Sequence, residues 1–163
     1  MDSLMFYTVS DRYIEYMQAF ERRIYNNYKS MSPNPHPYVG ILFRIGEIPY
    51  IAPLVSMKDK YLSKKDKLDM ILLKPYSVIN LNNMMPVPIS EVMYIDFSTQ
   101  EPKYGSLLRK EWELCKSKQT KIIEFANRLY FGIVNGKLVM PQCFDYKFLE
   151  TKCQDFIAKI MRG

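Results

Sequence analysis

The segment YVGILFRIGEIPYIAPL, residues 38–54, constrains the fold of this chain more than any other feature. Two runs rich in β-branched and aromatic residues meet at Gly46, a pattern typical of a β-hairpin. We expect the second strand of this hairpin to end at Pro53. Such a hairpin is a natural centre for a sheet, so the remaining strands should form around it.

Further strand-like runs lie in the first half of the chain, at residues 5–9, 70–73, 78–81 and 92–97. The second half instead repeats apolar residues at helical spacing from Pro102 onward. This arrangement favours an α+β domain over alternating β-α-β units, with a helical C-terminal half.

Three helical regions are predicted. Ser10 or Asp11 caps a first helix that runs to about residue 24, with Ile14, Met17 and Phe20 facing a core. A helical pair follows Pro102 and ends at Asn135 and Gly136, and a last helix spans residues 144–160. Residues 26–37 hold three prolines and three asparagines, which predicts a loop.

Length and charge suggest one domain with a polyanionic partner. The chain has 163 residues, a net charge of +6, 13 tyrosines and 9 phenylalanines. One core over residues 1–163 suits that length better than two. Positive charge attracts polyanions and flat rings stack on bases, although lysines that merely solvate the surface would leave the same composition.

Several classes of site are excluded. There is no apolar run of about 20 residues and no signal peptide, so we expect a cytoplasmic protein with no membrane partner. Cys115, Cys143 and Cys153 are too widely spaced for a metal clamp and should be reduced, semi-buried thiols. With one histidine and no clustered glycines, we expect no metal, no cofactor and no phosphate-binding loop.

A cationic, hydroxyl-bearing set of residues remains, and it suits a phosphodiester. Its members are Ser56, Lys58 and Lys60 just after a strand, the loop residues Tyr28, Lys29 and His36, and the amides of Asn80 and Asn82. RNA carries its own nucleophile, the 2'-hydroxyl, so cleavage requires a proton acceptor, a proton donor and a stabiliser of phosphoryl charge. A capping serine, solvated lysines, a surface imidazole and an asparagine turn remain the simpler interpretations.

Four segments together resemble one known family. FYTVSDRYIEYM, the hairpin with its extension APLVSMKDK, VINLNNMMPVP and CFDYKFLETKCQDF are similar to the ToxN/AbiQ/CptN family, the protein toxins of type III toxin–antitoxin systems. The resemblance implies a compact, twisted antiparallel sheet flanked by helices, as in the MazF and Kid toxins. It also implies a metal-independent endoribonuclease that leaves 2',3'-cyclic phosphate and 5'-hydroxyl ends.

The same resemblance implies partners. Family members process and bind a repetitive pseudoknotted RNA antitoxin, which holds them inactive in a closed ring of alternating proteins and RNAs. Free toxin cleaves cellular or phage transcripts, in many cases as abortive infection. A non-catalytic RNA-binding protein and a plain protein-interaction domain are the alternatives.

Residue roles follow from the matching motifs. Ser56 and Lys58 take the positions of the family's catalytic serine and lysine, while Val55 lacks the hydroxyl common before that serine. His36 and Tyr28 are candidates for proton transfer. We expect RNA contacts from Lys29, Lys60, Lys64, Lys65, Lys67, Asn80, Asn82, Lys118 and Lys121.

Overall fold

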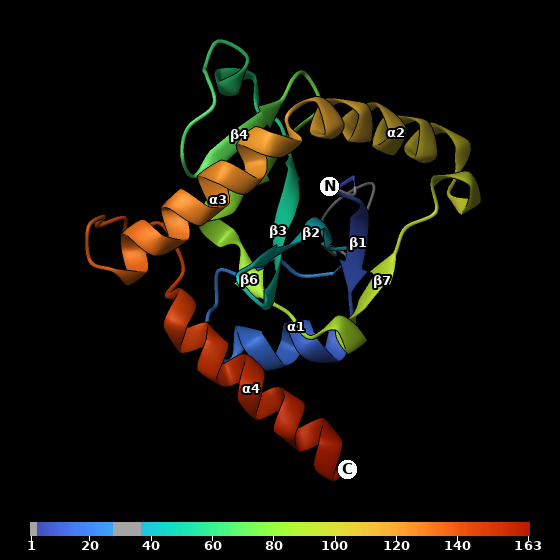
Figure 1. The fold of residues 1–163 in the computed structure, drawn as a ribbon. Coiled ribbons are helices and arrows are strands. Elements are labelled where there is room, and N and C mark those ends of the chain that lie inside the picture. The colour runs from blue at the N-terminus through green and yellow to red at the C-terminus, as the bar shows by residue number, and fades with distance from the viewer. Residues whose placement is uncertain (1–2, 28–36) are drawn as a thin grey trace.

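A computed structural model describes residues 3–27 and 37–163 of the chain (Figure 1). One antiparallel sheet forms the centre, with strands in the order β4-β5-β3-β2-β1-β7 and β6 paired to β3. The strands are β1 Phe6–Val9, β2 Val39–Ile45, β3 Ile48–Ser56, β4 Met70–Leu73, β5 Ser77–Asn80, β6 Met85–Pro86 and β7 Val92–Tyr94. The helices are α1 Asp11–Gln18, α2 Pro102–Ser117, α3 Gln119–Val134 and α4 Tyr146–Arg162. The predicted α+β class is confirmed.

The predicted hairpin is confirmed as β2 and β3. Gly46 has a φ of +59° in the turn, a conformation that favours glycine. Gly40 on β2 lies so close to β3 that an added Cβ would approach the Ala52 carbonyl oxygen at 2.6 Å. β2 therefore approaches β3 closely at Gly40, and the two strands are paired from Gly40 to Ile45.

The predicted end of the second strand, Pro53, is wrong by three residues. Beyond Pro53 the strand leaves β2 and pairs with β5 instead, in the register Leu54↔Ile79 and Ser56↔Ser77. This exchange of partners, which a single strand pattern does not reveal, extends β3 to Ser56.

The first helix begins as predicted and ends earlier. The Ser10 hydroxyl accepts a hydrogen bond from the Tyr13 amide, so the N-cap is confirmed. The helix stops at Gln18, whose side-chain amide donates to the Ile24 carbonyl. Ile24 is therefore buried by a turn rather than by a helix, and Phe20, expected in the core, is exposed.

Two other boundaries differ. Strand β7 ends at Tyr94, before the expected residue 97, because Asp96 caps a short 3-10 turn that begins at Phe97. The last helix begins at Tyr146, where Asp145 accepts from the Phe148 amide, and continues to Arg162. The helical pair ends at Asn135 and Gly136 as predicted.

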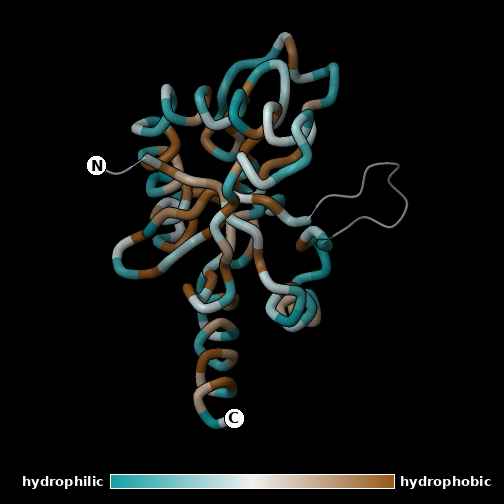
Figure 2. The backbone as a smooth tube through the Cα atoms, turned by 90° about the vertical axis from the view of Figure 1, so that its right-hand side faces the viewer, coloured by the Kyte–Doolittle hydropathy of each residue, from teal (hydrophilic) through white to brown (hydrophobic). Residues whose placement is uncertain are grey.

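The helices cover the sheet in two groups. In Figure 1, α1 and α4 lie together at one end, whereas α2 and α3 lie at the other. Glu150 of α4 ties the groups to the sheet, because its carboxylate accepts hydrogen bonds from Tyr50 of β3 and Tyr130 of α3. Apolar segments are concentrated in the body, and the last turns of α4 project from it (Figure 2).

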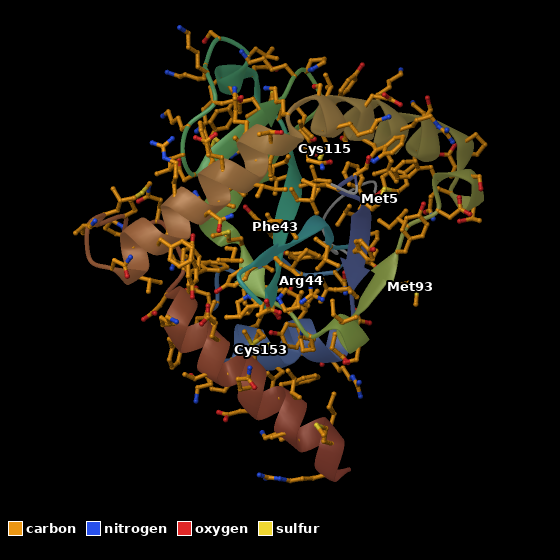
Figure 3. All side chains as sticks on the ribbon, viewed as in Figure 1. Met5, Phe43, Arg44, Met93, Cys115 and Cys153 are labelled. Atoms are coloured by element: carbon orange, nitrogen blue, oxygen red, sulfur yellow. The ribbon has the colours of Figure 1, made fainter. Side chains whose placement is uncertain are left out.

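The three cysteines are free and buried, which is deeper than the semi-buried position expected. Cys115 on α2 and Cys153 on α4 lie above and below the centre of the sheet in Figure 3. Among the described residues, no helix has the length and apolar character that a membrane span requires.

Candidate active site

A cavity of about 610 Å³ opens where β3 ends. Its wall is formed by the end of β3 with the turn after it, by β5, by one face of α2, and by the residues around 25–26 and 37–39. Of the residues predicted to be functional, the structure places Ser56, Lys58 and Asn80 in this wall.

Ser56 and Lys58 are presented by the strand end and the turn that follows. Ser56 is the last residue of β3 and pairs with Ser77, and the Met57 amide continues the ladder to the Tyr76 carbonyl at 3.1 Å. Lys58 has extended backbone and precedes the 3-10 turn Asp59–Tyr61. Both side chains are exposed, so a hydroxyl and a cation reach a bound molecule from the same short segment.

Tyrosines and an asparagine line the rest of the cavity. Tyr25, Tyr38, Tyr61 and Tyr104 contribute rings, and Asn80 donates from Nδ2 to the Tyr25 hydroxyl at 3.2 Å. The Asn80 Oδ1 and Tyr38 hydroxyl oxygens are buried without a hydrogen-bond partner. The cavity therefore offers flat apolar faces together with unsatisfied acceptors, which suits a nucleotide.

Glu111 is a cavity residue that the sequence reasoning missed. It is 6% exposed and is the one acidic side chain in the cavity wall among the described residues. Burial raises its pKa to about 7, and the nearby Ser77 hydroxyl offsets part of that rise. A signal was present, because Glu111 stands at helical spacing between the buried Leu108 and Cys115, inside the apolar stripe of α2.

Asn82 lies outside the cavity. Its side-chain amide donates to Asp69 at 3.4 Å, and its carbonyl accepts from the Phe144 amide at 3.0 Å. These bonds join the turn after β5 to the residue before β4 and to the segment before α4. The local role of Asn82 is therefore to hold this junction.

The predicted lysines separate into two places. Lys64, Lys65, Lys118 and Lys121 line a second groove of about 570 Å³ together with Lys74, whereas Lys60 and Lys67 are exposed and lie outside both cavities. Asp66 lies within this lysine groove and binds the ammonium groups of Lys118 and Lys121, each at 3.0 Å. Burial favours a higher pKa for Asp66, but the Leu72 amide, Lys121 and Lys118 outweigh it and lower the pKa.

Tyr28, Lys29 and His36 lie outside the described residues. The described residues next to that segment include Asn26 and Pro37, and both of these line the cavity. Asn27 joins the two ends, since its Oδ1 accepts from the Tyr38 amide at 2.6 Å and its Nδ2 donates to the Val9 carbonyl at 2.8 Å. Within residues 3–27 and 37–163, no group of three or more acidic, histidine or cysteine side chains could hold a metal ion.

Comparisons with known proteins agree along nearly the whole chain. A family model described as toxin ToxN, type III toxin–antitoxin system, matches residues 5–154. The endoribonuclease ToxN of Bacillus thuringiensis subsp. kurstaki is 29% identical over 167 residues, which cover 95% of this chain and 85% of that protein. The fold is also that of AbiQ, a lactococcal anti-phage endoribonuclease of a type III system, with a TM-score of 0.78, 26% identity and coverage of 96% and 99% of the two chains.

A further solved structure concerns selective toxin inhibition by a non-coding RNA pseudoknot in a type III system. It matches with a TM-score of 0.75 and 28% identity, over 95% of this chain and 98% of that one. The homologues are thus endoribonuclease toxins of type III toxin–antitoxin systems.

Proposed function

This chain belongs to the ToxN toxin family of type III toxin–antitoxin systems, and we propose that it is a metal-independent endoribonuclease that acts at the Ser56 cavity. Residues 1–163 form its single ribonuclease domain, and its substrates are cellular or phage transcripts in the cytoplasm. The observation that carries the proposal is the presence of Ser56 and Lys58 in one tyrosine-lined cavity.

The reaction begins with attack of a ribose 2'-hydroxyl on the adjacent phosphorus. The bond from phosphorus to the 5'-oxygen breaks, which leaves a 2',3'-cyclic phosphate and a 5'-hydroxyl. Lys58 supplies an ammonium and Ser56 a hydroxyl donor to the phosphoryl oxygens, where negative charge increases in the transition state. His36 and Tyr28 remain our candidates for moving protons to and from the two ribose oxygens.

The cavity walls also suit the bases next to the cleaved bond. The partly exposed rings of Tyr25, Tyr61 and Tyr104 provide stacking faces, and Asn80 lies beside them with an Oδ1 that no described protein donor binds. These contacts would fix the ribose and phosphate beside Ser56.

We further propose that the lysine groove, with Lys60, Lys67 and Lys29, binds a repetitive pseudoknotted RNA antitoxin that the toxin itself processes. Five lysines line the groove around a single carboxylate, so its charge is strongly positive. A ring of alternating proteins and RNAs would keep the toxin inactive, and release would arrest growth during phage infection.

The test compares wild-type protein with S56A and K58A in excess chelator, using cellular RNA and mapping the product ends. Each substitution should lower the cleavage rate by about 10²-fold or more, as loss of one transition-state donor does. S63A and K137A, at exposed serine and lysine positions outside the cavity, are matched controls that should cleave normally. Cleavage by wild type that survives S56A and K58A would refute the site.

The alternative function is non-catalytic RNA binding by the same basic surface. It predicts RNA affinity that falls steeply with salt and no strand scission by any variant. An absence of cyclic-phosphate ends in the wild-type reaction would favour this alternative.

A further inference from the structure

A buried carboxylic acid shares the cavity wall with Ser56, the proposed cleavage residue. Glu111 projects from α2 into the cavity wall, is 6% exposed, and forms no ion pair with any described residue. Burial of an ionised carboxylate without a cation lowers the stability of the folded protein, so a buried carboxyl group of this kind suggests a functional role.

A second hydroxyl connects this carboxyl to the reaction site. Ser77 lies directly opposite Ser56 in the β3–β5 pairing, so the two side chains point to the same face of the sheet, with Cβ atoms about 5 Å apart. The Ser77 hydroxyl is buried and has no hydrogen-bond partner in the structure, and it lies near enough to the Glu111 carboxyl to lower its pKa. Ser56, Ser77 and Glu111 thus line one cavity, with Ser77 next to the other two.

We propose that Glu111 is a positioning residue that controls, through Ser77, the direction of the Ser56 hydroxyl; this inference rests on the proposed function. When Glu111 is neutral, its O–H donates to Ser77, Ser77 donates to Ser56, and the Ser56 proton is directed at a phosphoryl oxygen. When Glu111 is ionised, it accepts from Ser77, and Ser77 accepts from Ser56. The Ser56 lone pairs then face the anionic phosphate.

No covalent bond changes in this reorientation, because the Ser56 and Ser77 side chains only rotate about single bonds, which brings the unpartnered Ser77 hydroxyl into contact with its two neighbours. The effect is electrostatic, because the Ser56 hydroxyl hydrogen, which stabilises the negative phosphoryl oxygen in the transition state, is replaced by the Ser56 oxygen lone pairs, which repel it. Neutral Glu111 is therefore the active form, and activity should fall as Glu111 ionises.

The surroundings of Glu111 allow both forms near neutral pH. Burial raises its pKa to about 7. The charged or titratable side chains that share its cavity are Lys58, Tyr25, Tyr38, Tyr61 and Tyr104, and β4, which packs against α2, contributes the apolar residues Met70–Leu73. Among the described residues the Ser77 hydroxyl is thus the main polar influence on Glu111.

The experiment measures single-turnover cleavage of one RNA between pH 6 and pH 8.5 by wild type, E111Q and S77A. With a pKa of about 7, the protonated fraction of Glu111 falls about 30-fold over this range. The ratio of the wild-type to the E111Q rate constant should fall by about that factor, and other titrating groups cancel in the ratio. E113Q, two residues along the same helix and exposed, should give a constant ratio.

S77A separates the relay from a merely structural role for Glu111. The ratio of the wild-type to the S77A rate constant should also fall about 30-fold between pH 6 and pH 8.5. The ratio of the S77A rate constant to that of the double variant S77A/E111Q should not change with pH. Were E111Q unable to fold, the S77A ratio alone would decide the question.

If wild-type protein cleaves RNA but the ratio of the wild-type to the E111Q rate constant does not change with pH, this inference is overturned and the proposed function stands. An absence of cleavage by wild type at every pH would overturn both. A pH-dependent ratio that persists in the S77A background would overturn the relay.

Discussion

The Glu91 carboxylate gives the most direct test of how this fold is stabilised. It lies in the turn before β7 with a side chain 1% exposed, and it binds the Arg12 guanidinium at 2.6 and 2.7 Å. The hydroxyls of Ser10 and Ser90 donate to it at 2.7 and 2.8 Å. Substitution E91Q keeps the shape of this side chain and removes its charge.

The size of the effect follows from the pKa. Hydrogen bonding from Arg12, then from Ser10 and Ser90, outweighs burial and lowers the pKa of Glu91 from 4.5 to about 2. At about 1.4 kcal/mol per pH unit this difference corresponds to about 3 kcal/mol of folding stability. Because Arg12 is 62% exposed, solvent screening reduces the expected loss in E91Q at pH 7 to about 2 kcal/mol.

The sign of the pH dependence is also defined. A carboxylate whose folded pKa is lowered contributes stability above its unfolded pKa of about 4.5 and loses it as pH falls towards 2. The difference in unfolding free energy between wild type and E91Q should therefore have its full value of about 2 kcal/mol at pH 7 and less than half of that value at pH 3.

Urea unfolding at pH 7, 5, 4 and 3 measures this difference. E113Q is the matched control, because Glu113 is 60% exposed in its pair with Lys116 and should cost less than about 0.5 kcal/mol. A difference for E91Q that is independent of pH, or as small as that for E113Q, would refute the reasoning.

Two further predictions concern the hairpin and the lysine groove. G40A should lower the unfolding free energy by about 2–3 kcal/mol, because the added Cβ would meet the Ala52 carbonyl oxygen. G46A should lower it by only about 1 kcal/mol, because the added Cβ meets no atom within 4 Å and only the positive φ is unfavourable. Urea unfolding that gives the two variants equal stability would contradict this prediction. D66N should lower the unfolding free energy by about 1–2 kcal/mol. Because it frees the ammonium groups of Lys118 and Lys121, it should also make RNA affinity fall more steeply with salt concentration. An unchanged slope in a binding titration against salt would show that these lysines do not contact phosphate.

Local patterns predicted most of the sheet and the helix starts. The hairpin turn at Gly46, the strand Met70–Leu73 and the Ser10 cap each depend on a few neighbouring residues, so they could be found without tertiary information. The end of the first helix could not, because Ile24 has helical spacing and is buried, yet a non-helical turn places it there.

The candidate site shows the same division. The hydroxyl of Ser56 and the ammonium of Lys58 belong to two positions of one local motif, and the family resemblance pointed to them. Glu111 belongs to the cavity only because α2 packs against β4 and brings Glu111 close to Ser77 at the start of β5. The pairing of Asp66 with Lys118 likewise joins residues far apart in the chain. Such long-range partners are decided by packing rather than by spacing.

The exchange of partners along β3 bears on when during synthesis this protein could become harmful. The end of β3 gains its neighbour only when β5 has been made, and the cavity gains its last wall only with α2. A nascent chain that has not yet emerged beyond β5 holds Ser56 on an unpaired strand end, and one that has not yet emerged beyond α2 still lacks a wall of the cavity. Translation would thus produce most of the chain before the proposed nuclease site is complete.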